Sequence, residues 1–199
     1  MKILALELST SRGSMAWLDG EIDFTREWPN DRKNSAAFFE NLQGLRRKFG
    51  APETIVVGLG PGSYAGTRIA ISAAVGLQLS CDARLIGYPS ICAMESDAQE
   101  YCVVGDARRK SFFFSRILRN KLVEGPTLFS GPDLKLNLES LDPGIPVFSS
   151  EVLLQFDRAV IRFPSALVLA RLAEEPRHSF FLPPLEPIYL REPHITIRK

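Results

Sequence analysis

Histidine and cysteine are scarce in this chain, which has two histidines and three cysteines among 199 residues. His178 and His194 lie far apart in a proline-rich region, so the pair of nearby histidines that a zinc peptidase places on one helix face is missing. Two surface histidines are the simpler explanation. Cys81, Cys92 and Cys102 sit in or beside apolar segments, which indicates small buried side chains and a reducing compartment.

The chain also has little net charge and no long hydrophobic run. A formal net charge of +1 argues against a protein that works mainly by attraction to phosphate. Local basic patches at 46–48 and 108–110 stay open as an alternative, although a solvated face is the simpler explanation of both runs. The apolar run at Ile3–Leu6 ends at Glu7. It is therefore too short for the core of a signal peptide or for a membrane span. We therefore expect a cytoplasmic protein that contacts no membrane.

A glycine-rich segment is the most informative feature that is present. Residues 58–69 join a predicted strand at Thr54–Val57 to a predicted helix at Ile69–Leu79. A loop of this kind leaves backbone N–H groups at a helix N-terminus, where an anion or another backbone can approach closely. Its structural residues are Gly58, Gly60, Pro61, Gly62, Ser63 and Gly66.

Known glycine motifs fit this segment poorly. The lysine of a Walker sequence is absent, and Ser63 lacks the flanking glycines of a nucleophile elbow, so we expect it to cap the following helix. The loose dinucleotide pattern is present, but the next predicted strand, Arg84–Ile86, does not end in an acidic residue. A tight turn that lets strand and helix pack closely stays open beside a ligand site.

The predicted elements repeat once along the chain. Strands are predicted at 2–8, 14–18, 22–28, 54–57 and 84–86, and helices at 35–49, 69–79 and from Ser90. The second half is predicted to have strands at 101–106, 111–118, 121–128, 146–148 and 159–163, and a helix at 164–174 that carries proline at its first position. This β-β-β-α-β-α order, repeated with one helix eroded, predicts an α/β protein with lobes at 1–100 and 101–199. An extended tail begins at Pro183.

Four segments resemble the TsaB family, also called YeaZ. They are residues 1–10, the glycine motif at 58–69, Asp106–Arg109 and Pro187–Arg191. The resemblance implies an actin-like fold of the sugar-kinase and heat-shock ATPase type, with duplicated lobes. TsaB is a non-catalytic paralogue of the enzyme TsaD, and the two pair through their first lobes. With the ATPase TsaE they form N6-threonylcarbamoyladenosine at position 37 of tRNAs that read codons starting with A.

The resemblance also implies the partners and the missing chemistry. We expect a TsaD-type paralogue and a TsaE-type ATPase as partners, a homodimer when the chain is alone, and contact with tRNA only through the complex. No catalytic residue, metal site or cofactor is expected. The chain departs from the family at Glu7 and Leu8, where Asp-Thr is usual, and at Asn34, where histidine is frequent.

Actin-like ATPases grip phosphates with two strand hairpins, and both are altered here. Glu7, Ser9, Thr10 and Asp106 are the candidates for a remnant nucleotide site. The turn after Asp106 has three long cationic side chains where bare backbone is required, so we expect no ATP hydrolysis. A stand-alone actin-like ATPase or kinase is the alternative, and a nucleotide-independent homodimeric binding module is a third hypothesis.

Small residues on the helix after the glycine motif permit close approach of another helix, and Phe38, Phe39 and Leu42 on the preceding helix could supply matching knobs. Ordinary packing inside one lobe explains the same pattern. With the resemblance, the candidate partner-binding residues are Phe38, Leu42, Arg68, Ile69, Ser72, Ala73 and Gly76.

Overall fold

The structure is a computed structural model that describes residues 1–30 and 35–191. Asn34 and His194 lie outside the described residues. The first half contains β1 (Lys2–Glu7), β2 (Arg12–Asp19), β3 (Ile22–Pro29), α1 (Ala36–Phe49), β4 (Thr54–Gly58), α2 (Tyr64–Cys81), β5 (Arg84–Tyr88) and the short 3-10 helix η1 (Ser90–Ala93). The second half contains β6 (Glu100–Asp106), β7 (Ser111–Leu118), β8 (Lys121–Ser130), α3 (Gly131–Ser140), β9 (Val147–Ser149), β10 (Ala159–Ile161) and α4 (Ala166–Glu174).

Two five-stranded sheets of the same topology form the core of the fold. Their strand orders are β3-β2-β1-β4-β5 and β8-β7-β6-β9-β10. In each sheet the first three strands are antiparallel, and the central strand pairs in parallel with the strand that follows the helix. This duplication confirms the predicted α/β fold of actin-like type.

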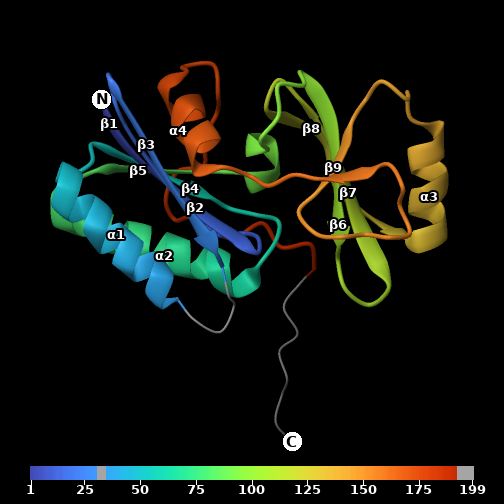
Figure 1. Ribbon diagram of the computed structural model, residues 1–199, viewed down its shortest axis with the longest axis horizontal. Helices are drawn as coiled ribbons and strands as arrows, with labels where there is room; N and C mark the ends of the chain where they lie inside the picture. Colours follow the sequence, from blue (N-terminus) through green and yellow to red (C-terminus); the bar gives the residue numbers. More distant parts are fainter. Residues whose placement is uncertain (31–34, 192–199) are drawn as a thin grey trace, which may run out of the picture.

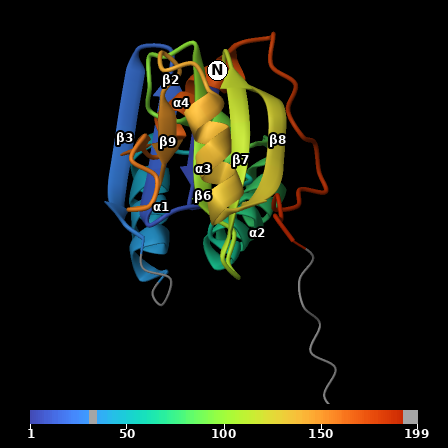
Figure 2. The same cartoon turned by 90° about the vertical axis from the view of Figure 1, so that its right-hand side faces the viewer.

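The sheets and helices are arranged in layers (Figure 1). Helices α1 and α2 cover one face of the first sheet, and α4 covers the other face. The second sheet lies beyond α4, and α3 covers its far face, as the perpendicular view also shows (Figure 2). Although α4 follows the second sheet in sequence, it packs against β1, β2 and β4 of the first.

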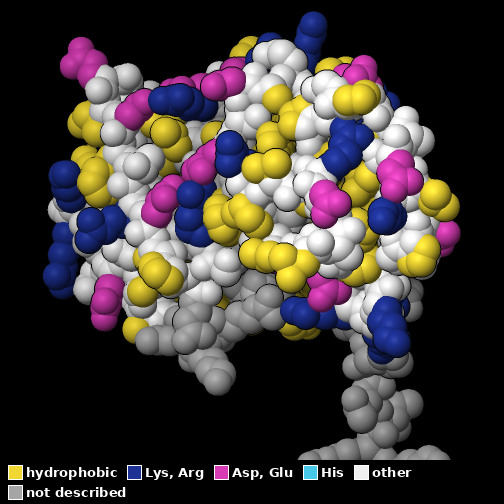
Figure 3. Space-filling model, turned by 45° about the vertical axis from the view of Figure 1, so that its right-hand side comes forward, with side chains coloured by type: hydrophobic (Ala, Val, Ile, Leu, Met, Phe, Trp, Pro, Cys, Tyr) yellow, Lys and Arg dark blue, Asp and Glu magenta, His cyan; other side chains and the backbone are white. Residues whose placement is uncertain are grey.

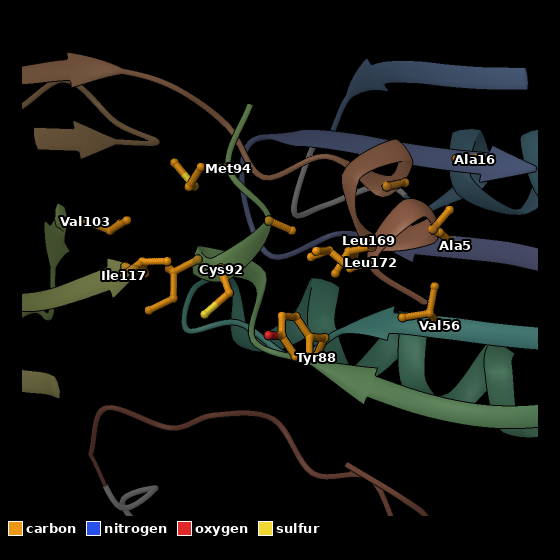
Figure 4. Close-up of a cluster of buried hydrophobic side chains, with 14 of the residues drawn as sticks. Ala5, Ala16, Val56, Tyr88, Cys92, Met94, Val103, Ile117, Leu169 and Leu172 are labelled. Carbon is orange, nitrogen blue, oxygen red and sulfur yellow. The ribbon is translucent and has the colours of Figure 1, made fainter. Parts of the chain in front are cut away.

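Strand β1 serves two separate cores because its side chains alternate between the two faces of the sheet. Leu4 and Leu6 point into the cluster formed with α1 and α2. Ile3 and Ala5 belong to the central cluster, which also contains residues of α4 and of the second sheet. Figure 4 shows this central cluster, with Ala5, Val56, Leu169, Leu172, Val103 and Ile117 among its members.

Two predicted helix starts need correction, and one helix was missed. Helix α2 begins at Tyr64 rather than Ile69, so the glycine loop is shorter than predicted. Helix α4 begins at Ala166, after Pro164 rather than with it. Helix α3 was not predicted, although Ser130 and Pro132 mark its start in the way expected of a cap and a first-turn proline. The eroded helix is the one between β9 and β10, where residues 150–158 form turns.

The cysteine prediction is confirmed in part, and the histidine prediction is wrong at His178. All three cysteines are free; Cys92 and Cys102 are buried and Cys81 is half-buried. Burial raises the pKa of Cys92 to about 12, which suits an inert core thiol. His178 is buried rather than exposed, and its Nδ1 lies 3.1 Å from the Tyr88 hydroxyl.

Within the described residues, no helix is both long and apolar enough to cross a membrane.

Candidate functional site

A cleft of about 1000 Å³ lies between the two lobes. Its walls come from the turn between β1 and β2, the N-terminus of α2, the turn between β6 and β7, and the C-terminal segment 187–191. Of the four predicted nucleotide-site candidates, Ser9, Thr10 and Asp106 line this cleft. Glu7 lies away from the cleft, because its side chain is buried beneath the glycine loop.

The glycine loop packs directly on the backbone of the β1–β2 turn. A Cβ atom at Gly62 would lie 2.1 Å from the Ser9 carbonyl oxygen, and one at Gly66 would lie 2.1 Å from that of Leu8. The Ser63 N–H donates a hydrogen bond of 2.5 Å to the Ser9 carbonyl. The bare backbone therefore serves close packing between two segments of one lobe, one of the two roles the sequence left open.

Glu7 holds the turn from inside. Its Oε1 accepts a hydrogen bond of 2.6 Å from the Ser9 N–H, and the carboxylate fills the space where a side chain at Gly58 would stand. Complete burial raises the pKa of Glu7, an effect that the nearby hydroxyls of Ser9 and Ser90 oppose. The carboxyl group therefore acts as a structural element of the first hairpin.

The carboxylate of Asp106 is engaged by its own turn. Its Oδ1 accepts a hydrogen bond of 2.6 Å from the Arg108 N–H, and its Oδ2 pairs with the Arg108 guanidinium at 3.1 Å. The Asp106 N–H donates to Glu151 Oε1 at 2.6 Å. Arg108 and Arg109 line the cleft at the place where a phosphate-gripping turn needs glycine.

Helix α2 is anchored at its start and open on its outer face. Ser63 caps the helix as predicted, since its hydroxyl accepts a hydrogen bond of 3.3 Å from the Gly66 N–H. Arg68, Ser72 and Gly76 are exposed, whereas Ile69 and Ala73 are half-buried.

The prediction that Phe38 and Leu42 contact a partner is wrong for this arrangement of α1. Both side chains lie in the core between α1 and the first sheet, with Phe38 only 1% exposed. Phe39 occupies the outward position and is 50% exposed.

Three cleft residues were not singled out from the sequence. Tyr64, the first residue of α2, lies with its ring centroid 5.5 Å from that of Tyr189. The Arg68 guanidinium lies 5.0 Å from the Tyr64 ring centroid and bonds to the Tyr64 hydroxyl. Arg191 lines the same cleft. The only signal in the sequence was their position inside or at the end of the motifs at 58–69 and 187–191.

Two solved structures from Pseudomonas aeruginosa have this fold over nearly the whole chain. YeaZ superposes with a TM-score of 0.74 and 19% sequence identity, covering 95% of this chain and 99% of that chain. An uncharacterized protein with similarity to peptidase YeaZ gives a TM-score of 0.75 and 19% identity, with 96% and 99% coverage. Residues 38–129 match the family model of TsaD, tRNA N6-adenosine threonylcarbamoyltransferase. No curated protein matches the sequence.

The duplicated sheets and the cleft between them define a two-lobed α/β protein of the actin-like class. The resemblance to the TsaB (YeaZ) family that the motifs indicate is confirmed in the fold, which this chain shares with YeaZ over 95% of its length.

Substitution of Gly66 by alanine tests the packing role of the glycine loop. We expect Gly66→Ala to lower the free energy of unfolding by about 1–3 kcal/mol, because the new Cβ would meet a backbone carbonyl. Gly76→Ala is the matched control in the same helix: nothing lies within 4 Å of its Cβ position, so a gain of about 0.5–1 kcal/mol is expected. Urea denaturation measures both, and equal effects of the two substitutions would refute the packing role.

The buried carboxyl group predicts a pH dependence of stability. Because burial raises the Glu7 pKa above its ordinary value of 4.5, the folded chain holds the Glu7 proton more tightly than the unfolded chain. The free energy of unfolding therefore falls as the pH rises from about 4.5 to the folded-state pKa. Glu7→Gln should remove this loss, so the variant gains stability over the parent as the pH rises.

Chemical denaturation between pH 4 and 8 measures the effect of Glu7→Gln. Glu40→Gln, at an exposed position on α1, is the control and should follow the parent. Parallel pH profiles for the parent and Glu7→Gln would contradict the burial of an ionisable group at this position.

Proposed function

We propose that the protein is a non-catalytic subunit of a complex that forms N6-threonylcarbamoyladenosine at position 37 of tRNAs reading codons that start with A. In this proposal it acts by pairing with a TsaD-type protein, together with a TsaE-type ATPase. Two findings support it: the YeaZ fold over nearly the whole chain, and the match of residues 38–129 to the TsaD family model. The matched range contains α2 and most of α1.

The exposed outer face of α2 is the main structural support for this proposal. Ser72 and Gly76 are exposed, and a Cβ at Gly76 would meet nothing within 4 Å, so the backbone of the helix is accessible there. Val75 and Leu79 are also exposed, by 37% and 83%. Short side chains beside large apolar ones suit the close packing of a second helix.

A non-catalytic role is supported by the state of the two hairpins. Glu7 is buried inside the first hairpin, and the carboxylate of Asp106 is paired within the second. Arg108 and Arg109 occupy the wall of the cleft where phosphates would need free backbone N–H groups. The same α2 face would pair two copies of the chain when no TsaD-type protein is present.

The test is size-exclusion chromatography with light scattering on this protein mixed with the TsaD-type protein of its own organism. We expect a stable complex, and we expect Gly76→Phe to weaken it at least tenfold, or about 1.4 kcal/mol, because the ring prevents close approach of a helix. The open space around Gly76 allows this variant to fold.

Leu136→Phe, at a 65% exposed position on α3, is the control and should pair like the parent. Separate elution of the two parent proteins would refute the pairing. If Gly76→Phe pairs as well as the parent, the outer face of α2 is not part of the interface.

A further inference from the structure

Two half-exposed tyrosines lie side by side at the cleft between the lobes. Tyr64 is 50% exposed and Tyr189 is 40% exposed, and both line the cleft. Their ring planes are inclined by 34° at a centroid distance of 5.5 Å. The Arg68 guanidinium lies 5.0 Å from the centroid of the Tyr64 ring. The pair forms an aromatic surface that solvent can reach, on which another flat ring can stack.

Cationic side chains stand on two walls of the same cleft. Arg191 follows Tyr189 on one wall, and Arg108 and Arg109 come from the β6–β7 turn on the other. Arg108 is paired with Asp106, whereas neither Arg109 nor Arg191 forms an ion pair with any residue that the structure describes. Acidic and basic side chains are interspersed over most of the face in Figure 3, and Lys and Arg side chains also stand along its left margin and at its lower right.

The basic turn has a backbone conformation that its residues disfavour. Arg108, Arg109 and Lys110 have φ values of 66°, 55° and 59°, and none of them is glycine. Three consecutive left-handed residues with long side chains are rare because each Cβ crowds the following carbonyl oxygen. The turn leaves the side chains of all three residues exposed.

We propose that the tyrosine pair and the flanking cations bind single-stranded RNA. Bases stack on Tyr64 and Tyr189, and phosphates pair with Arg109 and Arg191. A stacking surface bordered by cations is the arrangement by which proteins hold single-stranded nucleic acid without reading its sequence. Cations on two separate walls suit the repeated phosphates of a strand better than the single phosphate group of a mononucleotide.

This site would give the chain a direct RNA contact in addition to the indirect contact expected through a complex. It does not depend on pairing with a TsaD-type protein. Tyr64 opens α2, whereas Leu79 lies near the other end, about 22 Å away along the helix axis at 1.5 Å per residue. The RNA site and most of the proposed pairing face are therefore separable.

The experiment is fluorescence anisotropy of a labelled 12-nucleotide single-stranded RNA of mixed sequence, titrated with the full chain alone. We expect saturable binding that the double variant Tyr64→Ala, Tyr189→Ala weakens at least tenfold, while Tyr64→Phe, Tyr189→Phe binds like the parent because stacking is kept. Arg109→Gln should weaken binding. It should also make the negative slope of log K against log salt shallower by about 0.7, the value for one lost phosphate contact on a single strand.

Lys135→Gln, an exposed charge on α3, is the matched control and should leave both the affinity and the slope unchanged. Thermal unfolding confirms that each variant is folded. Absence of saturable RNA binding overturns the proposal, as does an equal loss in Arg109→Gln and Lys135→Gln, which would indicate attraction to overall charge. Competition by adenosine monophosphate at the same concentration as RNA would assign the site to a free nucleotide and overturn it too.

The assay contains no TsaD-type protein, so its result is independent of the proposed function. A chain that binds RNA but elutes apart from the TsaD-type protein would refute the pairing and support the RNA site. A chain that pairs with the TsaD-type protein but does not bind RNA would support the pairing and refute the RNA site.

Discussion

The arrangement of the first lobe and of its side of the cleft depends on the contact between the glycine loop and the β1–β2 turn. Gly62 and Gly66 bring one backbone against the carbonyl oxygens of Ser9 and Leu8, at distances that no side chain permits. This contact sets the start of α2 and encloses Glu7 at its base. Because α2 is fixed at its N-terminus, its outer face is presented in one orientation relative to the first sheet.

The same contact decides what the interlobe cleft can do. In an actin-like ATPase, bare backbone in two hairpins is kept for phosphate. Here the first hairpin accepts the glycine loop, and the second carries arginines with its aspartate paired internally. The cleft that results has aromatic and cationic walls, and the chain presents an open helix beside it. Both features are suited to binding other macromolecules.

Much of the fold could be predicted from the sequence, because strand alternation and the order of elements depend on local patterns. The limits lie where tertiary contacts decide. Phe38 and Phe39 are adjacent on a helix and point about 100° apart, so the pattern alone did not show which one enters the core. Helix α3 was missed because only Leu134 and Leu138 are buried along it, which gives a weak apolar stripe.

The site was predictable in kind but not in detail. The glycine spacing showed that bare backbone was needed between 58 and 66, but it contained no information on whether a ligand or a second segment lies against it. That second segment, at Leu8 and Ser9, is distant in sequence. Tyr64 and Tyr189 meet only because the C-terminal segment returns to the first lobe, where the Ile188 N–H bonds to the Leu59 carbonyl at 2.8 Å. His178 is buried for a similar reason, since Tyr88 of β5 lies beside it.

We propose that the glycine motif and the altered hairpins serve packing and partner binding in place of nucleotide hydrolysis. Calorimetric titration of the isolated chain with Mg-ATP tests it most directly. We expect no saturable heat of binding at millimolar nucleotide, because Asp106 is paired within its turn and Glu7 is buried away from the cleft. Tight, stoichiometric binding would contradict it and would identify the chain as a nucleotide-dependent actin-like protein.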